Sequence, residues 1–285
     1  MKKSRYAWLI VPIAVPVGAL AVYGALRSPQ RDAVAYAATD TPPKAKQAQP
    51  AQQAQPAQQV SPEANQALKK MTDYLAGLKS FRVDNATTDE ILTTSGQKIQ
   101  YATDSRVSVV RPNHLRSEQI VSPNALMFTY DGKSITLYCK ADNTYATAPA
   151  PPTLDATIDM VRSKYDADTP GADLLYSHPY DILMEQVKSG LVIGPEVIEA
   201  TLTNHLAFEG DTVDWQIWIK DGSEPLPMRF VITTKDLPNR PQFTVELTNW
   251  QPQAVIDESQ FEFKPPPNAK KVDKMPTDCG GKLHH

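Results

Sequence analysis

One stretch of the sequence decides the fold class: Val213-Asp214-Trp215-Gln216-Ile217-Trp218-Ile219-Lys220. Apolar and polar residues alternate over most of it, and alternation with a period of two is typical of a strand with one buried face. Trp218 breaks the alternation, because it places a large apolar side chain on the otherwise polar face. We therefore expect a strand whose first face is buried and whose second face is partly covered.

The segments around this strand have the same character. Hairpin-type turn pairs occur at Ser95-Gly96, Asp131-Gly132, Gly210-Asp211 and Asp221-Gly222, and each separates stretches rich in β-branched and aromatic residues. This pattern predicts an antiparallel sheet. The expected strands are 107–110, 126–130, 134–138, 144–147, 201–208, 213–220, 228–234, 243–250 and 261–263.

Two helical regions are expected to cover this sheet. Ser61-Pro62 is a helix start, since serine caps free N–H groups and proline suits the first helical position. Apolar residues then recur at helical spacing as far as Leu78. A second region, the insert 153–188, is expected to hold two amphipathic helices, the later one over 179–188. The fold class is mainly β (α+β): a curved antiparallel sheet with an N-terminal helix and a helical lid.

The N-terminus carries a targeting signal. A positive start, with Lys2, Lys3 and Arg5, precedes an uncharged and mainly apolar run over 8–26. The sequence Ala35-Tyr36-Ala37 fits a signal-peptide cleavage site, while the length of the run fits a membrane-spanning anchor. Residues 1–38 are therefore read as either a signal peptide or an inner-membrane anchor. Both readings place the rest of the chain in the periplasm or cell envelope.

Residues 39–61 form a linker of proline, alanine, glutamine and lysine, in which the hexapeptide Ala-Gln-Pro-Ala-Gln-Gln occurs twice in tandem. The linker has no large apolar side chains to bury, so we expect it to be disordered. It is read as a spacer or as low-complexity filler. The folded domain is expected over 62–272 and a flexible tail over 273–285.

Catalytic and metal-binding patterns are not found in the sequence. It lacks the common motifs of zinc proteases, α/β-hydrolases, dinucleotide-binding proteins and phosphate-binding loops. The five histidines show no ligand spacing apart from the terminal pair His284-His285. A net charge of −3 and a pI of about 6.0 argue against a nucleic-acid partner. We expect a protein without enzymatic activity, cofactor or metal, and the oligomeric state is left open.

The sequence has two cysteines, Cys139 and Cys279, which are candidates for a disulfide bond. An even cysteine count in an oxidising compartment favours pairing, and two free thiols are the alternative. A bond here would fasten the C-terminal tail to the sheet.

Several short motifs, taken in their order along the chain, resemble a family of predicted periplasmic proteins of unknown function. That family is similar to the LolA/LolB-type superfamily of lipoprotein carriers. The resemblance covers roughly residues 65–272 and implies a half-open, curved β-barrel with helices over its mouth, in which the wider superfamily carries acyl chains. It is carried by 136–138, 143–147, 172–176, 205–208, 213–219, 225–227 and 261–263.

The leading hypothesis is a binding protein for an amphiphile, such as a lipid or a lipoprotein acyl chain. The alternative is a membrane-tethered protein-interaction or sensor module in the periplasm. Each candidate side chain has ordinary core packing as its alternative role. The candidate cavity wall is Trp215, Ile217, Ile219, Phe230 and Ile232, and the candidate lid is Leu154, Ile158, Val161, Leu183, Met184 and Val187.

Overall fold

The structure, a computed structural model, describes residues 59–120, 125–165, 167, 169–275 and 279. The predicted signal peptide or anchor, nearly all of the linker and much of the C-terminal tail lie outside these residues. Among the described residues, no helix combines the length and the apolar character needed to cross a membrane. The apolar run 8–26 lies outside the described residues.

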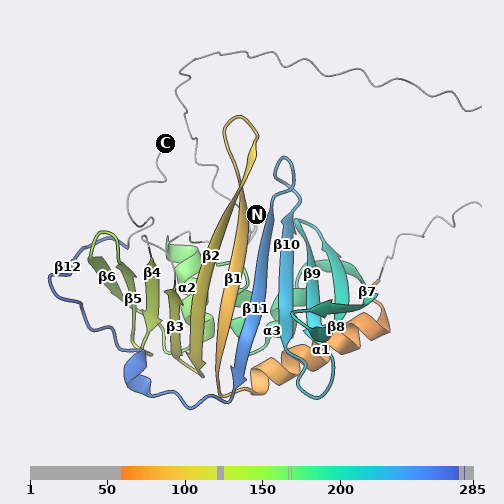
Figure 1. Ribbon diagram of the computed structural model, residues 1–285, viewed down its shortest axis with the longest axis horizontal. Coiled ribbons are helices and arrows are strands. Elements are labelled where there is room, and N and C mark those ends of the chain that lie inside the picture. Colours follow the sequence, from red (N-terminus) through yellow and green to blue (C-terminus); the bar gives the residue numbers. More distant parts are fainter. Residues whose placement is uncertain (1–58, 121–124, 166, 168, 276–278, 280–285) are drawn as a thin grey trace, which may run out of the picture. The chain divides into compact units, whose positions relative to one another are not determined.

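The described residues form one 12-stranded sheet (Figure 1). Its strands lie in the order β12-β6-β5-β4-β3-β2-β1-β11-β10-β9-β8-β7, so two antiparallel meanders meet where β1 pairs with β11. β12 and β7 are the two edges, and the sheet is not closed. The strands are β1 (Ser80–Leu92), β2 (Lys98–Val110), β3 (His114–Gln119), β4 (Leu126–Tyr130), β5 (Ser134–Cys139), β6 (Thr144–Pro149), β7 (Val187–Ile198), β8 (Thr201–Gly210), β9 (Val213–Lys220), β10 (Pro227–Thr234), β11 (Gln242–Pro252) and β12 (Lys270–Lys271).

The mainly β fold with a curved antiparallel sheet is thereby confirmed, and so are its predicted turns. All four turn pairs lie where one strand ends and the next begins. In the turn between β4 and β5, the Asp131 carboxylate accepts hydrogen bonds from the backbone N–H groups of Lys133 and Ser134. These bonds outweigh burial and lower the pKa of Asp131.

Four helical elements cover one face of the sheet: α1 (Pro62–Gly77), α2 (Leu154–Tyr165), the 3-10 helix η1 (Ala172–Leu175) and α3 (Pro179–Met184). α1 begins as its sequence predicts, because the Ser61 hydroxyl accepts a hydrogen bond from Ala64 N at 3.1 Å. Leu68, Met71 and Leu75 of α1 are fully buried. They share one apolar cluster with β9 and β10, so the core lies between the helices and this face.

The other face of the sheet is partly covered as well, which agrees with the expectation from the position of Trp218 in the sequence. Trp218 packs there with Met228 and Val231 in a smaller apolar cluster. The His205 ring stacks on Trp218 with a centroid distance of 3.9 Å. This cluster explains why the alternation in β9 is incomplete.

Two predicted elements are wrong, and four strands, β1, β3, β7 and β12, are absent from the predicted set. The helix predicted over 179–188 ends at Met184, and Val187 begins β7, a strand that the sequence analysis missed altogether. Residues 261–263 are not a strand. Phe261 is instead buried with its ring 5.1 Å from that of His114, and Phe263 contacts Tyr138 and Tyr145. These phenylalanines anchor a C-terminal strap, residues 253–275 together with Cys279, against the sheet.

Candidate functional site

The five candidate wall residues lie together on the helix-covered face of β9 and β10. Phe230 pairs with Ile217 across the two strands, and Ile232 pairs with Trp215. The Trp215 ring stacks on Phe208 at 4.0 Å and meets the edge of Phe230 at 5.7 Å. All five side chains, Ile219 included, are buried in the main core cluster. They form a continuous apolar surface rather than an open hollow.

All candidate lid residues except Ile158 pack onto the same cluster. We call α2, η1 and α3 the lid. Leu154, Ile158 and Leu183 are buried, whereas Val161 and Met184 are partly buried. Val187 also contacts the core, but from β7, so its assignment to the lid is corrected: a strand begins there because the α3 helix has already ended.

A small cavity lies at the joint between lid and sheet. It has a volume of about 30 Å³, and Leu183, Val187, Trp215 and Phe230 are among its lining residues. That is room for roughly one or two water molecules, whereas pockets for larger ligands occupy about 300–1,000 Å³. An acyl chain therefore needs displacement of the lid before it can lie on the apolar surface.

Polar contacts hold the lid together internally. The Arg162 guanidinium forms an ion pair with Asp173 at 3.0 Å and donates to the Thr169 hydroxyl at 2.7 Å. The Tyr176 hydroxyl donates to Asp159 at 2.7 Å. Burial raises the pKa of Tyr176, and the hydrogen bond to the Asp159 carboxylate raises it further. Because these bonds join α2 to η1 and its flanking loop, we expect the two to move as one body.

Few polar contacts fasten the lid to the sheet. At the start of α2, Leu154 N donates to Pro112 O at 2.9 Å. Just before it, the Tyr130 hydroxyl donates to Pro151 O at 2.5 Å. At the other end, the Arg111 guanidinium donates through Nη1 to Leu175 O at 2.7 Å.

Arg111 is the unusual residue of the site. Its Nε and Nη2 atoms are buried, and they have no hydrogen-bond partner among the described residues. Burial lowers the pKa of the Arg111 guanidinium, and the Asp155 carboxylate opposes this shift. Buried N–H groups of a cation are costly to leave unpaired, so these atoms offer a ready site for an anionic or carbonyl group.

A second, larger groove of about 580 Å³ lies on the opposite face. It is polar, and its arginines are already engaged. Arg106 binds Asp84 at 2.8 Å, Arg116 binds Glu118 at 2.8 Å, and Arg82 donates to the Gln260 side chain at 3.0 Å. This groove offers little apolar surface to an acyl chain.

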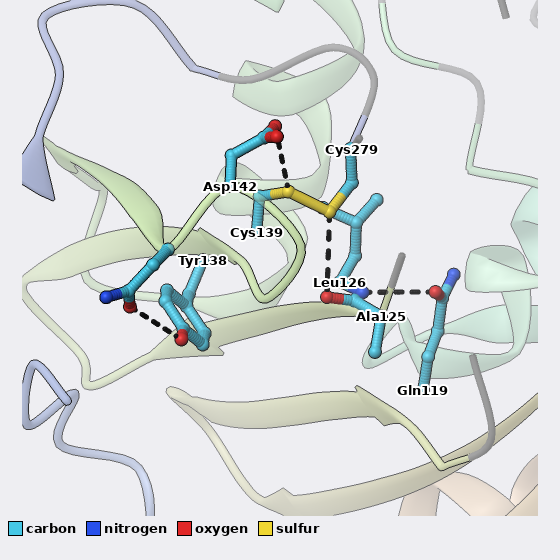
Figure 2. The surroundings of a disulfide bond; sticks show 8 residues. Gln119, Ala125, Leu126, Tyr138, Cys139, Asp142 and Cys279 are labelled. Atoms are coloured by element: carbon cyan, nitrogen blue, oxygen red, sulfur yellow. Dashed lines mark hydrogen bonds between the residues drawn. A yellow bond between two sulfur atoms is a disulfide. The ribbon is translucent and has the colours of Figure 1, made fainter. Parts of the chain in front are cut away.

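The strap fastens one end of the sheet. Cys139 of β5 and Cys279 are joined by a disulfide bond with their Cα atoms 5.3 Å apart. Figure 2 shows this bond beside Ala125 and Leu126, where Leu126 N donates to the Gln119 side chain at 3.0 Å. The tail is thus tied to the β4–β5 region, away from the cavity-lining strands β7–β10.

A family model described as predicted periplasmic protein (DUF2092) matches residues 64–274. The chain belongs to this family. The match spans the helices, the sheet and most of the strap, and it confirms the family predicted from the sequence. Its description also gives the periplasm as the compartment. No curated protein matches the sequence significantly.

Several solved structures are similar to this chain at low identity. The lipoprotein LppX of Mycobacterium tuberculosis is 14% identical with a TM-score of 0.46, over 70% of this chain and 100% of LppX. LprF of Mycobacterium bovis is 18% identical with a TM-score of 0.44, over 70% and 97%. A LolA superfamily protein of Nitrosomonas europaea is 10% identical with a TM-score of 0.38, over 70% and 97%. Because these TM-scores are low, the similarities carry no argument about a ligand.

In this member of the periplasmic family, the structure brings the predicted wall and lid residues, apart from Ile158, into one cluster. The sequence analysis missed Arg111. The sequence does mark this position, because Arg111-Pro112 follows directly after the apolar residues of a predicted strand, and such an X-Pro pair favours a turn. What the sequence could not give is the burial of its guanidinium by the lid, whose Leu175 lies 64 residues further along the chain.

Proposed function

We propose that this protein binds an amphiphile in the periplasm without chemical turnover. The apolar chain of the ligand, from a lipid or a lipoprotein, would lie on the surface formed by Trp215, Ile217 and Phe230. Its anionic or carbonyl-bearing head would bind the Arg111 guanidinium.

The observation that carries this proposal is Arg111. A buried guanidinium with two unpaired nitrogen atoms lies where the lid meets an apolar core. Burying these N–H groups without hydrogen-bond partners costs free energy. A carboxylate or phosphate would satisfy them through charge-assisted hydrogen bonds. An amphiphile supplies both that group and an apolar chain, which would run from Arg111 at the end of β2 across β1 and β11 to the apolar surface on β10 and β9.

Binding would require the lid to move away from β9 and β10. The small cavity beside Leu183 and Val187 marks a joint where lid and sheet already pack incompletely. Once the lid has moved, each methylene group of the ligand that is buried against the uncovered apolar surface would contribute about 0.8 kcal/mol to the free energy of binding. This gain offsets the lost contacts of the lid. The internal ion pair between Arg162 and Asp173 would stay intact as the lid moves.

The test is titration of the full chain with oleate and with lysophosphatidylcholine, using the Arg111→Met variant. Arg229→Met is the matched control, because Arg229 lies on the opposite face and pairs with Glu246 at 2.6 Å. We expect Arg111→Met to weaken oleate binding by roughly tenfold, the lower end for a hydrogen bond to a charged group. Arg229→Met should bind as the wild type does. Absence of binding by the wild type would contradict the proposal and favour the protein-interaction module.

A further inference from the structure

Exposed apolar side chains gather on one hairpin, β7–β8. Eight large apolar side chains are exposed in the described residues, and five of them lie here. Scattered exposed residues are normal in soluble proteins, but several on one hairpin mark a contact region. They flank the edge on both faces, because Val192 pairs with Leu206 of the main core face, whereas Leu191 pairs with Ala207 on the other face. We call these five residues the β7 patch: Leu191 (42% exposed), Val192 (38%), Ile193 (52%), Val197 (67%) and Leu202 (51%).

The patch lies at the free edge of the sheet, and its geometry does not favour the addition of another strand. Val197 pairs with Leu202 across the hairpin, and the register shifts between Val192 and Gly194. Gly194 has a φ of 142°, and Pro195 has no N–H group. A bulge and a proline are the features that block edge-to-edge pairing. The patch therefore offers apolar side chains rather than a backbone ladder.

The charge of the patch favours a neutral partner. Between Leu191 and Leu202 the only ionisable residues are Glu196 and Glu199, and there is no lysine or arginine. The Glu196 carboxylate accepts hydrogen bonds from Trp218 Nε1 at 2.9 Å and from His205 Nδ1 at 2.8 Å, so it is engaged within the protein. An anionic lipid surface would gain no attraction here, whereas a zwitterionic one would meet apolar side chains with little repulsion.

The chain outside the described residues enters the domain beside this patch. Val60 forms a parallel bridge with Gly190, and Ser61 N donates to Gly190 O at 2.8 Å. Val60 and Ser61, among the first described residues, therefore lie beside the residue that precedes Leu191. The same strand begins at Val187, which lines the cavity under the lid.

We propose that the β7 patch is a docking surface for a zwitterionic lipid bilayer. Its exposed leucine, isoleucine and valine side chains would enter the bilayer interface. This inference rests on the proposed function, because docking here would bring membrane amphiphiles to the β7 side of the lid.

The experiment is hydrogen–deuterium exchange of the full chain with and without phosphatidylcholine vesicles. The N–H groups on the outer edge of β7 exchange freely unless something covers them. We expect vesicles to slow exchange in peptides covering 190–203. The double variant Ile193→Asp/Val197→Asp should lose this protection. The matched control, Val255→Asp, changes a side chain that is 96% exposed on the strap and should keep it.

Each other outcome counts against the proposal. Unchanged exchange over 190–203, even with the chain bound to vesicles through its N-terminus, would overturn it. So would a dimer in sedimentation experiments that the double variant converts to monomer, because the patch would then be a contact between copies. Oleate titration separates the two proposals: if docking fails but oleate still binds through Arg111, only the docking surface is rejected.

Discussion

The two edges of the sheet are finished in different ways. At one edge, β12 pairs with β6, the Asn143 side chain donates to Pro267 O at 3.1 Å, and a disulfide ties Cys139 to Cys279. At the other edge, among the described residues, the outer side of β7 is paired only at Gly190, with Val60 and Ser61. Edge strands invite unwanted pairing, and proteins cover or distort them. Here one edge is covered by the strap, and the other is distorted and left apolar.

This contrast indicates that the two edges have different roles, one in stability and one in contacts. The strapped edge gives the sheet a fixed end, while the β7 edge adjoins both the cavity and α1. Changes at the strapped edge should therefore act on stability, and changes on the β7 patch should act on contacts with other molecules.

The largest expected effect comes from removing the disulfide with Cys139→Ala/Cys279→Ala. The bond closes a sequence separation of 140 residues. In the loop-entropy model its loss costs about 4–5 kcal/mol in the free energy of unfolding. Urea denaturation of the variant and of reduced wild type should give the same lowered midpoint. A midpoint equal to that of the oxidised wild type would show that the strap adds no stability.

A smaller loss is expected at the β7 edge from Gly190→Ala. A Cβ atom at Gly190 would lie 2.4 Å from the Phe208 ring, which is itself stacked on Trp215. Overpacking of this kind costs about 1–3 kcal/mol. Gly77→Ala is the control, since a Cβ there meets nothing within 4 Å. Equal thermal midpoints for the two variants would mean that Phe208 has room to move.

The β7 strand should also respond to pH through Glu196. Hydrogen bonds from Trp218 and then His205 lower the pKa of the Glu196 carboxyl below its ordinary value of 4.5. A lowered pKa in the folded state means that the contribution to stability is present above pH 4.5 and is lost as pH falls through the folded-state pKa. Denaturation at pH 7 and at successively lower pH should show this loss. Glu196→Gln should weaken it, and Glu199→Gln should leave it unchanged.

The smallest effect on stability is expected on the patch itself. Val197→Asp should change the free energy of unfolding by no more than about 0.5 kcal/mol, because the side chain is exposed. Ile198→Asp, one residue further, should destabilise much more, since Ile198 is buried in the second cluster. Similar losses for both variants would mean that Val197 is covered in solution.

Much of the fold could be predicted from the sequence, because its signals are local. The alternation in β9, the turn pairs and the Ser61-Pro62 cap each depend on neighbouring residues. β7 was missed because Gly190, Gly194 and Pro195 interrupt it and because its apolar residues are exposed rather than alternating. The Phe-Glu-Phe sequence at 261–263 alternates like a strand, yet its rings are placed by distant partners, His114 and Tyr138.

The candidate site could be predicted only in part, because the sequence patterns report on neighbouring residues and not on packing between distant ones. Wall and lid residues follow from apolar patterns, and all of them except Ile158 meet in one cluster. Whether a space exists between them depends on packing, and the cavity of about 30 Å³ shows that they are closed together. The burial of Arg111 depends on the lid as a whole, which no local pattern describes.

The most direct test of the account is photoaffinity labelling of the full chain with a diazirine-bearing fatty acid, followed by mapping of the labelled peptides. We expect labels on β9, β10 and α3, in peptides that contain Trp215, Phe230 and Leu183, and we expect unlabelled oleate to compete with this labelling. Labels confined to the β7 patch or to the polar groove around Arg106 would contradict binding between the lid and the sheet.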